Sequence, residues 1–566
     1  MSDLDDLLSF EAEIDEKIAQ CNVFQLPLKS VLTYLFWEID TMIRGKYFNN
    51  HIFKRQADGE ALASRLSYLA PFLQKCTSQI KIGAINAFLD TSQFEEEFQD
   101  IISYGHFCEL MPEVRKGYYE VIKFEEGFKL VHPNEEITRA EEYDIILTEL
   151  SLAFLVGEVP DLKPVFIDLA GQFSNPDIVL VSRVLITLYQ YRLNSIKELP
   201  ILEPNAFQIC TGTKWEDFCK IRAAIYAYTD YCIILANALK FLWFEESNHT
   251  REDALLEKFH ELVTVLDSKN FFLSLLAGLT NIKTTTIENI LSFFTIDIEN
   301  QNFKNAGEGF FPPLVNYSDY YLFNLYILRL MLASRNIIYV LKQTKPTEFD
   351  NTVSQYLEPT LLKQALKIWK QLEVKLPDMT ILSNVNWSKG EFDLLIYQSS
   401  SNTVLHIQAK APIPPQGARM TKAVENRSIE GIEQLNRFQD LPPNERDTVI
   451  SEIFKTPVKN VQCVSILLCR AGLGTHLAWK LKKDITVVNL QLLNGVIQIL
   501  FSKNLNLSDF KEVADSLLID IYNRSVLGWK QGFIPLNGII ISMPLLKLNH
   551  DEIAKIRIQL NSFLPD

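Results

Sequence analysis

Three polar residues in one short stretch have types and spacing suited to phosphodiester chemistry. Asp393 precedes the run Gln408-Ala-Lys410, all within the segment Gly390–Ala411. A hard cation such as Mg²⁺ (or Mn²⁺) takes oxygen ligands, which an Asp carboxylate and a Gln amide oxygen supply. A neighbouring lysine can position an attacking water and stabilise negative charge on a phosphate. We therefore take Asp393, Gln408 and Lys410 as candidate catalytic residues, with Asp393 and Gln408 as metal ligands.

The elements that must position these residues are two strands of a β-hairpin. β-Branched and aromatic residues flank them, and Ser399–Asn402 has the composition of a turn. A four-residue loop places Asp393 opposite Gln408 and Glu391 opposite Lys410, close enough to share an ion. A five-residue loop places Asp393 and Gln408 on opposite faces unless a bulge restores the phase. The hypothesis therefore commits to one register.

A glutamine carries no charge, so a second acid is expected to help it hold the metal. Glu358 lies in Glu358-Pro-Thr360, a start signal for a helix over Leu361–Leu372, and it is our candidate for a third metal ligand. Glu391 is the alternative. His406 lies on the same strand face as Gln408, where a helix-covered position explains it as well as proton transfer does.

A helix predicted around Ser428–Phe438 supplies candidates for substrate binding. Arg419, Lys422 and Arg427 precede or open it and are placed to contact substrate phosphates, although each is also explained as a solvated surface charge. Gln434 shares a helical face with Arg427 and is predicted to point toward the site.

The order of elements around the hairpin is helix, three strands, helix, strand. The predicted strands are Met379–Trp387, Glu391–Tyr397, Thr403–Ala409 and the buried run Val461–Cys469. Ile485–Leu493 reads as one more strand.

With these residues in place, the sequence resembles the PD-(D/E)XK, or restriction-endonuclease-like, nuclease superfamily. GEFDLLIY followed by HIQAKA is similar to the Mrr-type enzymes, in which Gln replaces the usual acid before x-Lys. The resemblance implies an αβββαβ core, Mg²⁺ on Asp393 and Gln408, a catalytic Lys410 and a first-helix acid that Glu358 matches. Gln434 and Phe438 are loosely similar to the QxxxY element of RecB-like members. The Pro-Asp usual ahead of the hairpin is missing, and the resemblance covers about a fifth of the chain, from Glu358 to Cys469.

The fold class that we predict is a multidomain chain, with a large mainly helical N-terminal region and an α/β restriction-endonuclease-like domain. Helical periodicity dominates residues 1–345, which we take as a regulatory or recognition region that divides near 160 in one alternative. It includes a helix over Trp215–Phe244, a β-hairpin at Tyr118–Val131 and aromatics at Tyr320–Tyr326 that suit helix cores. Residues 350–500 form the nuclease-like domain. Residues 501–566 are an α/β extension that either continues that domain or stands alone.

The charged residues are distributed unevenly between residues 1–350 and residues 351–566. The net charge is −15, yet residues 351–566 hold 24 Lys and Arg against 20 Asp and Glu. The predicted nuclease-like part can therefore approach a polyanion without strong repulsion, although acidic helices that keep residues 1–350 soluble explain the asymmetry equally well. The apolar run Ile225–Phe244 contains Asp230 and Lys240, which indicates a core helix and not a membrane span. The acidic N-terminus and eight scattered cysteines favour a cytoplasmic protein with reduced thiols.

Three functions stay open at this point. The first is an Mg²⁺-dependent DNA endonuclease, by fold analogy in bacterial defence against foreign DNA, with a homodimer cutting both strands and a protein partner on the helical region. The second is an inactive nuclease-like fold that serves as a nucleic-acid-binding or protein-interaction scaffold. The third is a structural helical protein in which Asp393 and Lys410 form only an exposed cross-strand pair.

Overall fold

The computed structural model describes most of the chain. The described residues are 2–47, 56–76, 92–151, 154–156, 163–171, 177–246, 262–298, 300, 302–307, 309–374, 376, 378–414 and 418–561. Helices predominate among them, and their strands form four sheets. None of the described helices combines the length and apolar character that a membrane crossing requires.

The sheet that carries the candidate residues has five strands in the order β13-β12-β11-β10-β9. These are β9 (Met379–Trp387), β10 (Gly390–Gln398), β11 (Thr403–Lys410), β12 (Gln462–Cys469) and β13 (Thr486–Val488). β9, β10 and β11 pair antiparallel, whereas β12 runs parallel to both β11 and β13. All eight residues of the central strand β11 are buried, including the polar His406, Gln408 and Lys410.

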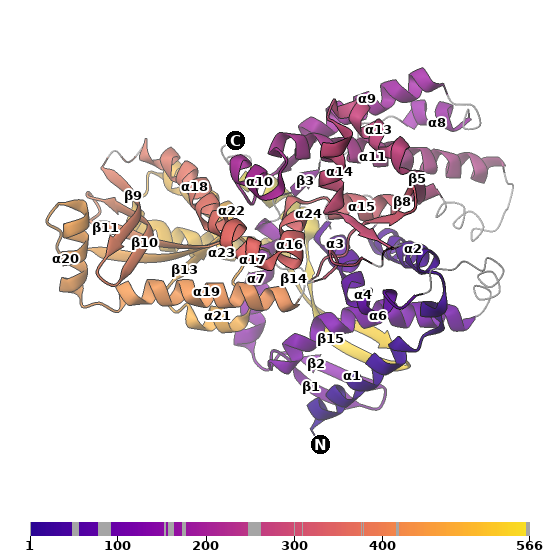
Figure 1. Ribbon diagram of the computed structural model, residues 1–566. Coiled ribbons are helices and arrows are strands. Elements are labelled where there is room, and N and C mark those ends of the chain that lie inside the picture. Colours follow the sequence, from indigo (N-terminus) through magenta and orange to yellow (C-terminus); the bar gives the residue numbers. More distant parts are fainter. Residues whose placement is uncertain are drawn as a thin grey trace.

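Helices cover both faces of this sheet (Figure 1). One face packs on α19 (Ala418–Gln439) and α20 (Pro443–Phe454), through a cluster that includes Leu395, Val404 and Phe438. The other face belongs to the large core and meets α18 (Ser354–Glu373), α22 (Leu490–Lys503) and α23 (Phe510–Ser525). The short α21 (His476–Leu481) packs beside α19.

The predicted strands and helices of this part are present, with three differences. The helix α18 begins at Ser354, directly after a π-helical turn over Phe349–Val353, so Glu358 lies inside it and not at its start. Pro359 lies inside the helix, where it supplies no backbone N–H for the intrahelical hydrogen bond at its position. The helix α19 starts ten residues before Ser428, at Ala418. Of the strand predicted at Ile485–Leu493, only Thr486–Val488 is a strand, because Asn489 caps α22 by accepting from the Leu492 amide.

Helices also dominate the part of residues 1–345 that the structure describes. They are α1 (Asp3–Ala19), α2 (Leu28–Tyr47), α3 (Gln56–Ser64), α4 (Ala70–Leu73), α6 (Ser92–Arg115), α7 (Glu135–Ser151), α8 (Lys163–Gly171), α9 (Ile178–Ser195), α10 (Pro204–Thr211), α11 (Trp215–Glu246), α13 (Lys269–Thr280), α14 (Thr284–Ser292), α15 (Leu325–Met331) and α16 (Ser334–Thr344), followed by α17 (Pro346–Glu348). The predicted helix over Trp215–Phe244 is confirmed by α11.

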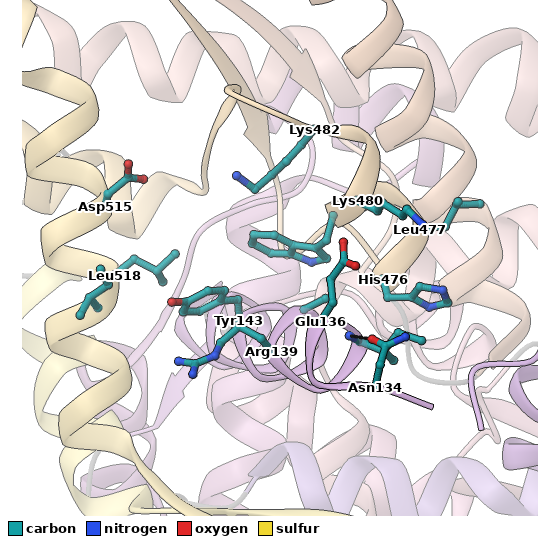
Figure 2. Close-up of a pocket in the computed structure, with 14 residues that line it drawn as sticks. Asn134, Glu136, Arg139, Tyr143, His476, Leu477, Lys480, Lys482, Asp515 and Leu518 are labelled. Carbon is teal, nitrogen blue, oxygen red and sulfur yellow. Dashed lines mark hydrogen bonds between the residues drawn. The ribbon is translucent and has the colours of Figure 1, made fainter. Parts of the chain in front are cut away.

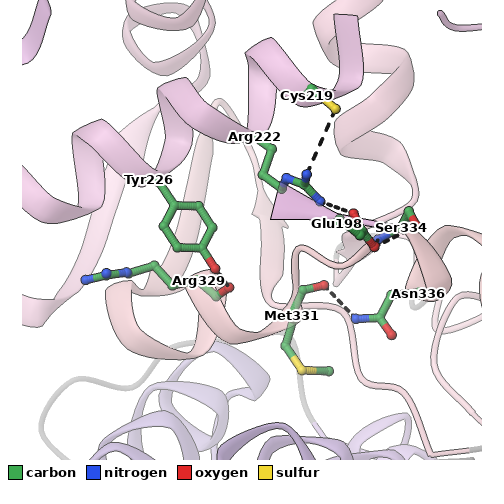
Figure 3. Close-up of polar contacts among 8 residues, drawn as sticks. All are labelled: Glu198, Cys219, Arg222, Tyr226, Arg329, Met331, Ser334 and Asn336. Atoms are coloured by element: carbon green, nitrogen blue, oxygen red, sulfur yellow. Dashed lines mark hydrogen bonds and ion pairs between the residues drawn. The ribbon is translucent and has the colours of Figure 1, made fainter. Parts of the chain in front are cut away.

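Buried polar contacts join these helices (Figure 3). The Glu198 carboxylate pairs with Arg222 of α11 and accepts from both the amide and the hydroxyl of Ser334, at 2.9 and 2.7 Å. Glu198 ends β4 (Ile196–Glu198), which pairs with β3 (Phe154–Val156). A charge buried in this way requires such partners to offset its lost hydration.

The helical region also contains a small sheet that the sequence did not reveal. Its order is β5-β8-β7-β6, made of β5 (Thr264–Ser268), β6 (Thr295–Asp297), β7 (Leu314–Tyr317) and β8 (Tyr320–Asn324). The assignment of Tyr320–Tyr326 to a helix was therefore wrong over its first five residues. The Asn324 side chain accepts from the amides of Tyr326 and Ile327, which ends β8 and starts α15.

The predicted hairpin at Tyr118–Val131 is present and pairs with the end of the chain. It consists of β1 (Glu120–Phe124) and β2 (Gly127–Val131), and β2 runs parallel to β15 (Ile539–Leu548). β15 in turn pairs with β14 (Val526–Leu536), and α24 (His550–Asn561) follows. Strands close to the C-terminus thus share a sheet with a hairpin that lies about 400 residues earlier in the chain (Figure 1).

Candidate active site

The hairpin adopts the register that brings Asp393 and Gln408 together. The pairs run from Gln398↔Thr403 to Leu394↔Ile407, so the loop has the four residues Ser399–Asn402. Asn402 closes it with a φ of 49°, a left-handed conformation that Asn tolerates, and its side chain donates to the Lys459 carbonyl at 2.9 Å. The predicted four-residue loop is confirmed.

Asp393 lies where β10 leaves its regular pairing with both neighbours. Gln408 Nε2 and the Ala409 amide donate to Asp393 Oδ2, at 2.5 and 2.7 Å. On the other side, Asn384 of β9 has a φ of 53°, and the pairing with β9 passes from Phe392↔Val385 to Leu394↔Ser383 without including Asp393. Burial raises the pKa of Asp393 to about 6, although the Ala409 amide and the charge of Lys410 act to lower it.

Lys410 ends β11 with its side chain only 4% exposed. Its Nζ lies 3.7 Å from Glu358 Oε1 of α18 and 3.6 Å from Glu430 Oε1 of α19. Gly431 provides the space for the lysine stem, because a Cβ there would lie 2.9 Å from Lys410 Cγ. The third alternative required Asp393 and Lys410 to form an exposed cross-strand pair. The Lys410 ammonium is instead buried between two carboxylates, so this prediction was wrong.

The structure distinguishes between the two candidate acids. Glu358 faces Lys410, and burial raises its pKa while the Lys410 charge opposes that rise. Glu391 is exposed and lies opposite Asn386 of β9. The prediction that Glu391 lies opposite Lys410 was therefore wrong. The pairing of β10 with β11 begins only at Leu394, three residues after Glu391.

Glu430 is a residue of this site that the sequence prediction did not include. Burial favours a higher pKa, but the bond from Arg427 and the charge of Lys410 outweigh it, so the pKa of Glu430 is lowered. The available signal was its spacing, three residues after Arg427 and four before Gln434, on the helix face assigned to the site.

The predicted substrate-binding cations have partners of their own. Arg427 donates to Glu430 Oε2 at 2.9 Å, and Lys422 pairs with Glu425. Both side chains are more than two-fifths exposed, at 57% and 46%. Arg419 lies in the first turn of α19, and its side chain falls outside the described residues.

Two further polar residues lie deeper in this layer. Gln434 has a buried Oε1 without a hydrogen-bond partner, one helical turn after Glu430. His406 is buried against Phe392 and Phe438, with ring centroids 4.7 and 5.5 Å away, and burial lowers its pKa to about 3. His406 is thus a neutral packing residue. The aromatic Phe438 serves this cluster.

Comparison with known proteins adds no family to this geometry. No protein-family model, no curated protein and no solved structure matches the chain. The site must be judged by its own chemistry.

The residues present suit a small, hard cation. Gln408 Oε1 is buried and has no hydrogen-bond partner, while Nε2 of the same amide donates to the Asp393 carboxylate. Such an orphaned amide oxygen is costly unless a donor or cation approaches it. Among the described residues, no three His, Cys, Asp or Glu side chains are grouped so that they could hold a metal, and a site here would need the Gln408 amide. Asp393 and Gln408, with Glu358 nearby, supply oxygen donors of the type that Mg²⁺ or Mn²⁺ takes.

Proposed function

We propose that the chain is a Mg²⁺- or Mn²⁺-dependent nuclease that hydrolyses phosphodiester bonds of DNA. The observation that supports this most is the meeting of Asp393, in the first half of β10, with Gln408 near the end of β11, where Lys410 and Glu358 also lie. The succession α18, β9, β10, β11, α19, α20, β12 follows the order of the αβββαβ core of the PD-(D/E)XK superfamily, which the sequence resembles, with α20 as an additional helix before β12.

Each side chain has a role in the proposed reaction. Asp393 and Gln408 would hold the cation, with Glu358 as a third oxygen donor. The bound cation would polarise the scissile phosphate and lower the pKa of a water molecule. Lys410, held between Glu358 and Glu430, would stabilise the negative charge that develops on the phosphate as water attacks and the sugar oxygen leaves.

Arg427 and Lys422 would contact flanking phosphates from the exposed side of α19. A role in cytoplasmic defence of bacteria, a homodimer and a protein partner on the helical region all belong to this proposal. None of them is needed for the reaction itself.

A second candidate is an inactive nuclease-like scaffold that binds nucleic acid or protein. The observation that favours it is the bond from Gln408 to Asp393, which engages the carboxylate, together with the two acids that neutralise Lys410. In an inactive protein, Asp393 and Lys410 could keep these partners permanently, because neither side chain would have to bind a metal or a phosphate.

Incubation of the purified chain with plasmid DNA or structured RNA and Mg²⁺ or Mn²⁺ tests the proposal. We expect nicking or linearisation of DNA by the wild-type chain and its loss in Asp393→Ala and Lys410→Ala. Cleavage that persists in both variants contradicts the site. Tight binding of DNA without cleavage supports the scaffold instead.

A further inference from the structure

A cavity of about 550 Å³ lies outside the candidate active site, between α7, α21 and α23. Figure 2 shows charged side chains from all three helices around it. Its volume is within the range of about 300–1,000 Å³ that is usual for sites of small molecules, and too small for a folded partner.

The cavity combines positive charge with aromatic and aliphatic walls. Arg139, Lys480 and Lys482 line it, against the carboxylates of Glu136 and Asp515. The Lys482 stem lies against Trp479, with Nζ 5.7 Å from the ring centroid, and Nζ donates to the Ile485 carbonyl at 3.3 Å.

Lys482 is a partly desolvated cation. Burial lowers its pKa, and the nearby Asp515 only partly offsets this. An anion that enters the cavity would therefore gain more from Lys482 than from a fully hydrated surface lysine.

The aromatic wall is held in place before any ligand arrives. The rings of Trp479 and Tyr143 lie 5.8 Å apart, centroid to centroid, and Trp479 Nε1 donates to Asp144 Oδ1 at 2.9 Å. From α23, Leu518 and the 48% exposed Ile519 supply aliphatic surface. A rigid aromatic wall with cations beside it suits a ligand that has both a planar ring and a negative group.

The same Asp144 carboxylate connects the cavity with the helix that carries Glu430. Besides Trp479, it accepts from the amides of Leu473 and Gly474, in the loop that follows β12. The next residue, Thr475, pairs through its hydroxyl with Glu425 of α19. One carboxylate thus holds both the cavity wall and the loop that leads to α19.

We propose that this cavity binds a nucleoside phosphate, with the base on the Trp479–Tyr143 wall and the phosphate on Lys482. The ligand is either a free nucleotide or the end of a nucleic-acid strand, since both present the same chemistry. This inference does not depend on nuclease activity.

Isothermal titration calorimetry on the full chain tests it, in EDTA and with Asp393→Ala as the background, so that the candidate active site neither binds metal nor cleaves. The probes are the four nucleoside monophosphates, ATP, GTP and a 5′-phosphorylated pentanucleotide. We expect saturable binding of at least one probe, weakened at higher salt. Tighter binding of the pentanucleotide identifies a strand end, and tighter binding of a mononucleotide identifies a free ligand.

Lys482→Met keeps the stem on Trp479 and removes the charge, and we expect at least tenfold weaker binding. The matched control is Lys483→Met, which makes the same change at the next, exposed residue outside the cavity lining and should stay within twofold of the background. Lys482→Gln, which also removes the charge, replaces Lys482→Met if that variant does not fold. Absence of binding by every probe overturns the proposal, as does equal weakening by Lys483→Met.

Discussion

Gln408 donates from its side-chain amide to Oδ2 of Asp393 over 2.5 Å, across the end of the β10–β11 hairpin. One member of this pair titrates and the other is neutral at every pH. The contributions of Asp393 and Gln408 to stability and to metal binding can therefore be distinguished by changing one residue at a time, with and without a divalent cation.

The stability of the metal-free chain should depend on the ionisation of Asp393. Its pKa is about 6 in the fold against an ordinary 3.8, so the folded chain binds the proton more tightly than the unfolded chain. The destabilising contribution is absent below about pH 4, grows as the pH rises to about 6 and is constant above that. Asp393→Asn should therefore raise the free energy of unfolding by about 1–3 kcal/mol at pH 8 and by little at pH 4.

Urea unfolding of both proteins at the two pH values measures this difference. Asp378→Asn serves as a control, because burial acts to raise the pKa of the Asp378 carboxyl but the bonds from Ser400 outweigh it, so that this pKa is lowered. Asp378→Asn should be about equally harmful at pH 8 and pH 4, because both lie above the ordinary pKa of 3.8 and the stabilising effect is lost only at lower pH. An equal effect of Asp393→Asn at both pH values contradicts the raised pKa.

Gln408→Glu should make the stability of the chain depend strongly on Mg²⁺. A second carboxylate against Asp393 adds like-charge repulsion, which we expect to cost about 1–2 kcal/mol without metal. A divalent cation offsets that repulsion and binds two carboxylates more tightly than one. Thermal unfolding with and without millimolar Mg²⁺ should thus show a larger rise in Tm for Gln408→Glu than for wild type. The conservative Gln498→Glu on α22, away from the site, should show no such difference, and a Mg²⁺ response equal to wild type in Gln408→Glu contradicts the metal assignment.

Lys410 and Glu430 should be coupled in stability. Lys410→Met leaves Glu358 and Glu430 facing each other without the buried ammonium, and we expect a loss of about 3 kcal/mol at pH 8. The loss should be smaller at pH 5, since a carboxyl without its cation has a higher pKa and is protonated sooner. Adding Glu430→Gln to Lys410→Met should recover part of the stability. A double-mutant cycle measures this coupling, and strictly additive effects contradict the contact.

The sequence predicted the local geometry of the site well because hairpin register depends on nearby residues. Alternation along β10 and β11 and the four residues of the turn determine which side chains oppose each other, and both are legible between Gly390 and Lys410. Glu358 was also found, since its helix directly precedes the strands. Its position within that helix was misjudged because tertiary packing extends α18 back through Pro359.

Residues that depend on distant contacts could not be found in this way. Glu430 reaches Lys410 only because Gly431 allows α19 to approach β11, and this depends on how the helix packs. Likewise, nothing near Ile540 in the sequence indicates that it pairs with Gly127. Strand pairing over such separations is a property of the whole fold.

The parallel pairing between β2 and β15 should fail in Gly127→Ala. Gly127 has a φ of 155°, and a Cβ there would lie 2.0 Å from the Ile540 carbonyl oxygen, so β2 and β15 could not keep their register. We expect a fall in stability of about 3 kcal/mol from a backbone clash that cannot relax, and faster amide hydrogen exchange throughout β14 and β15.

Gly117→Ala is the matched control. Gly117 also has a positive φ, 74°, but no atom lies within 4 Å of the added Cβ, so it should cost about 1 kcal/mol through strain alone. Equal effects of the two substitutions, with unchanged exchange in β15, would show that the C-terminal strands do not depend on this pairing.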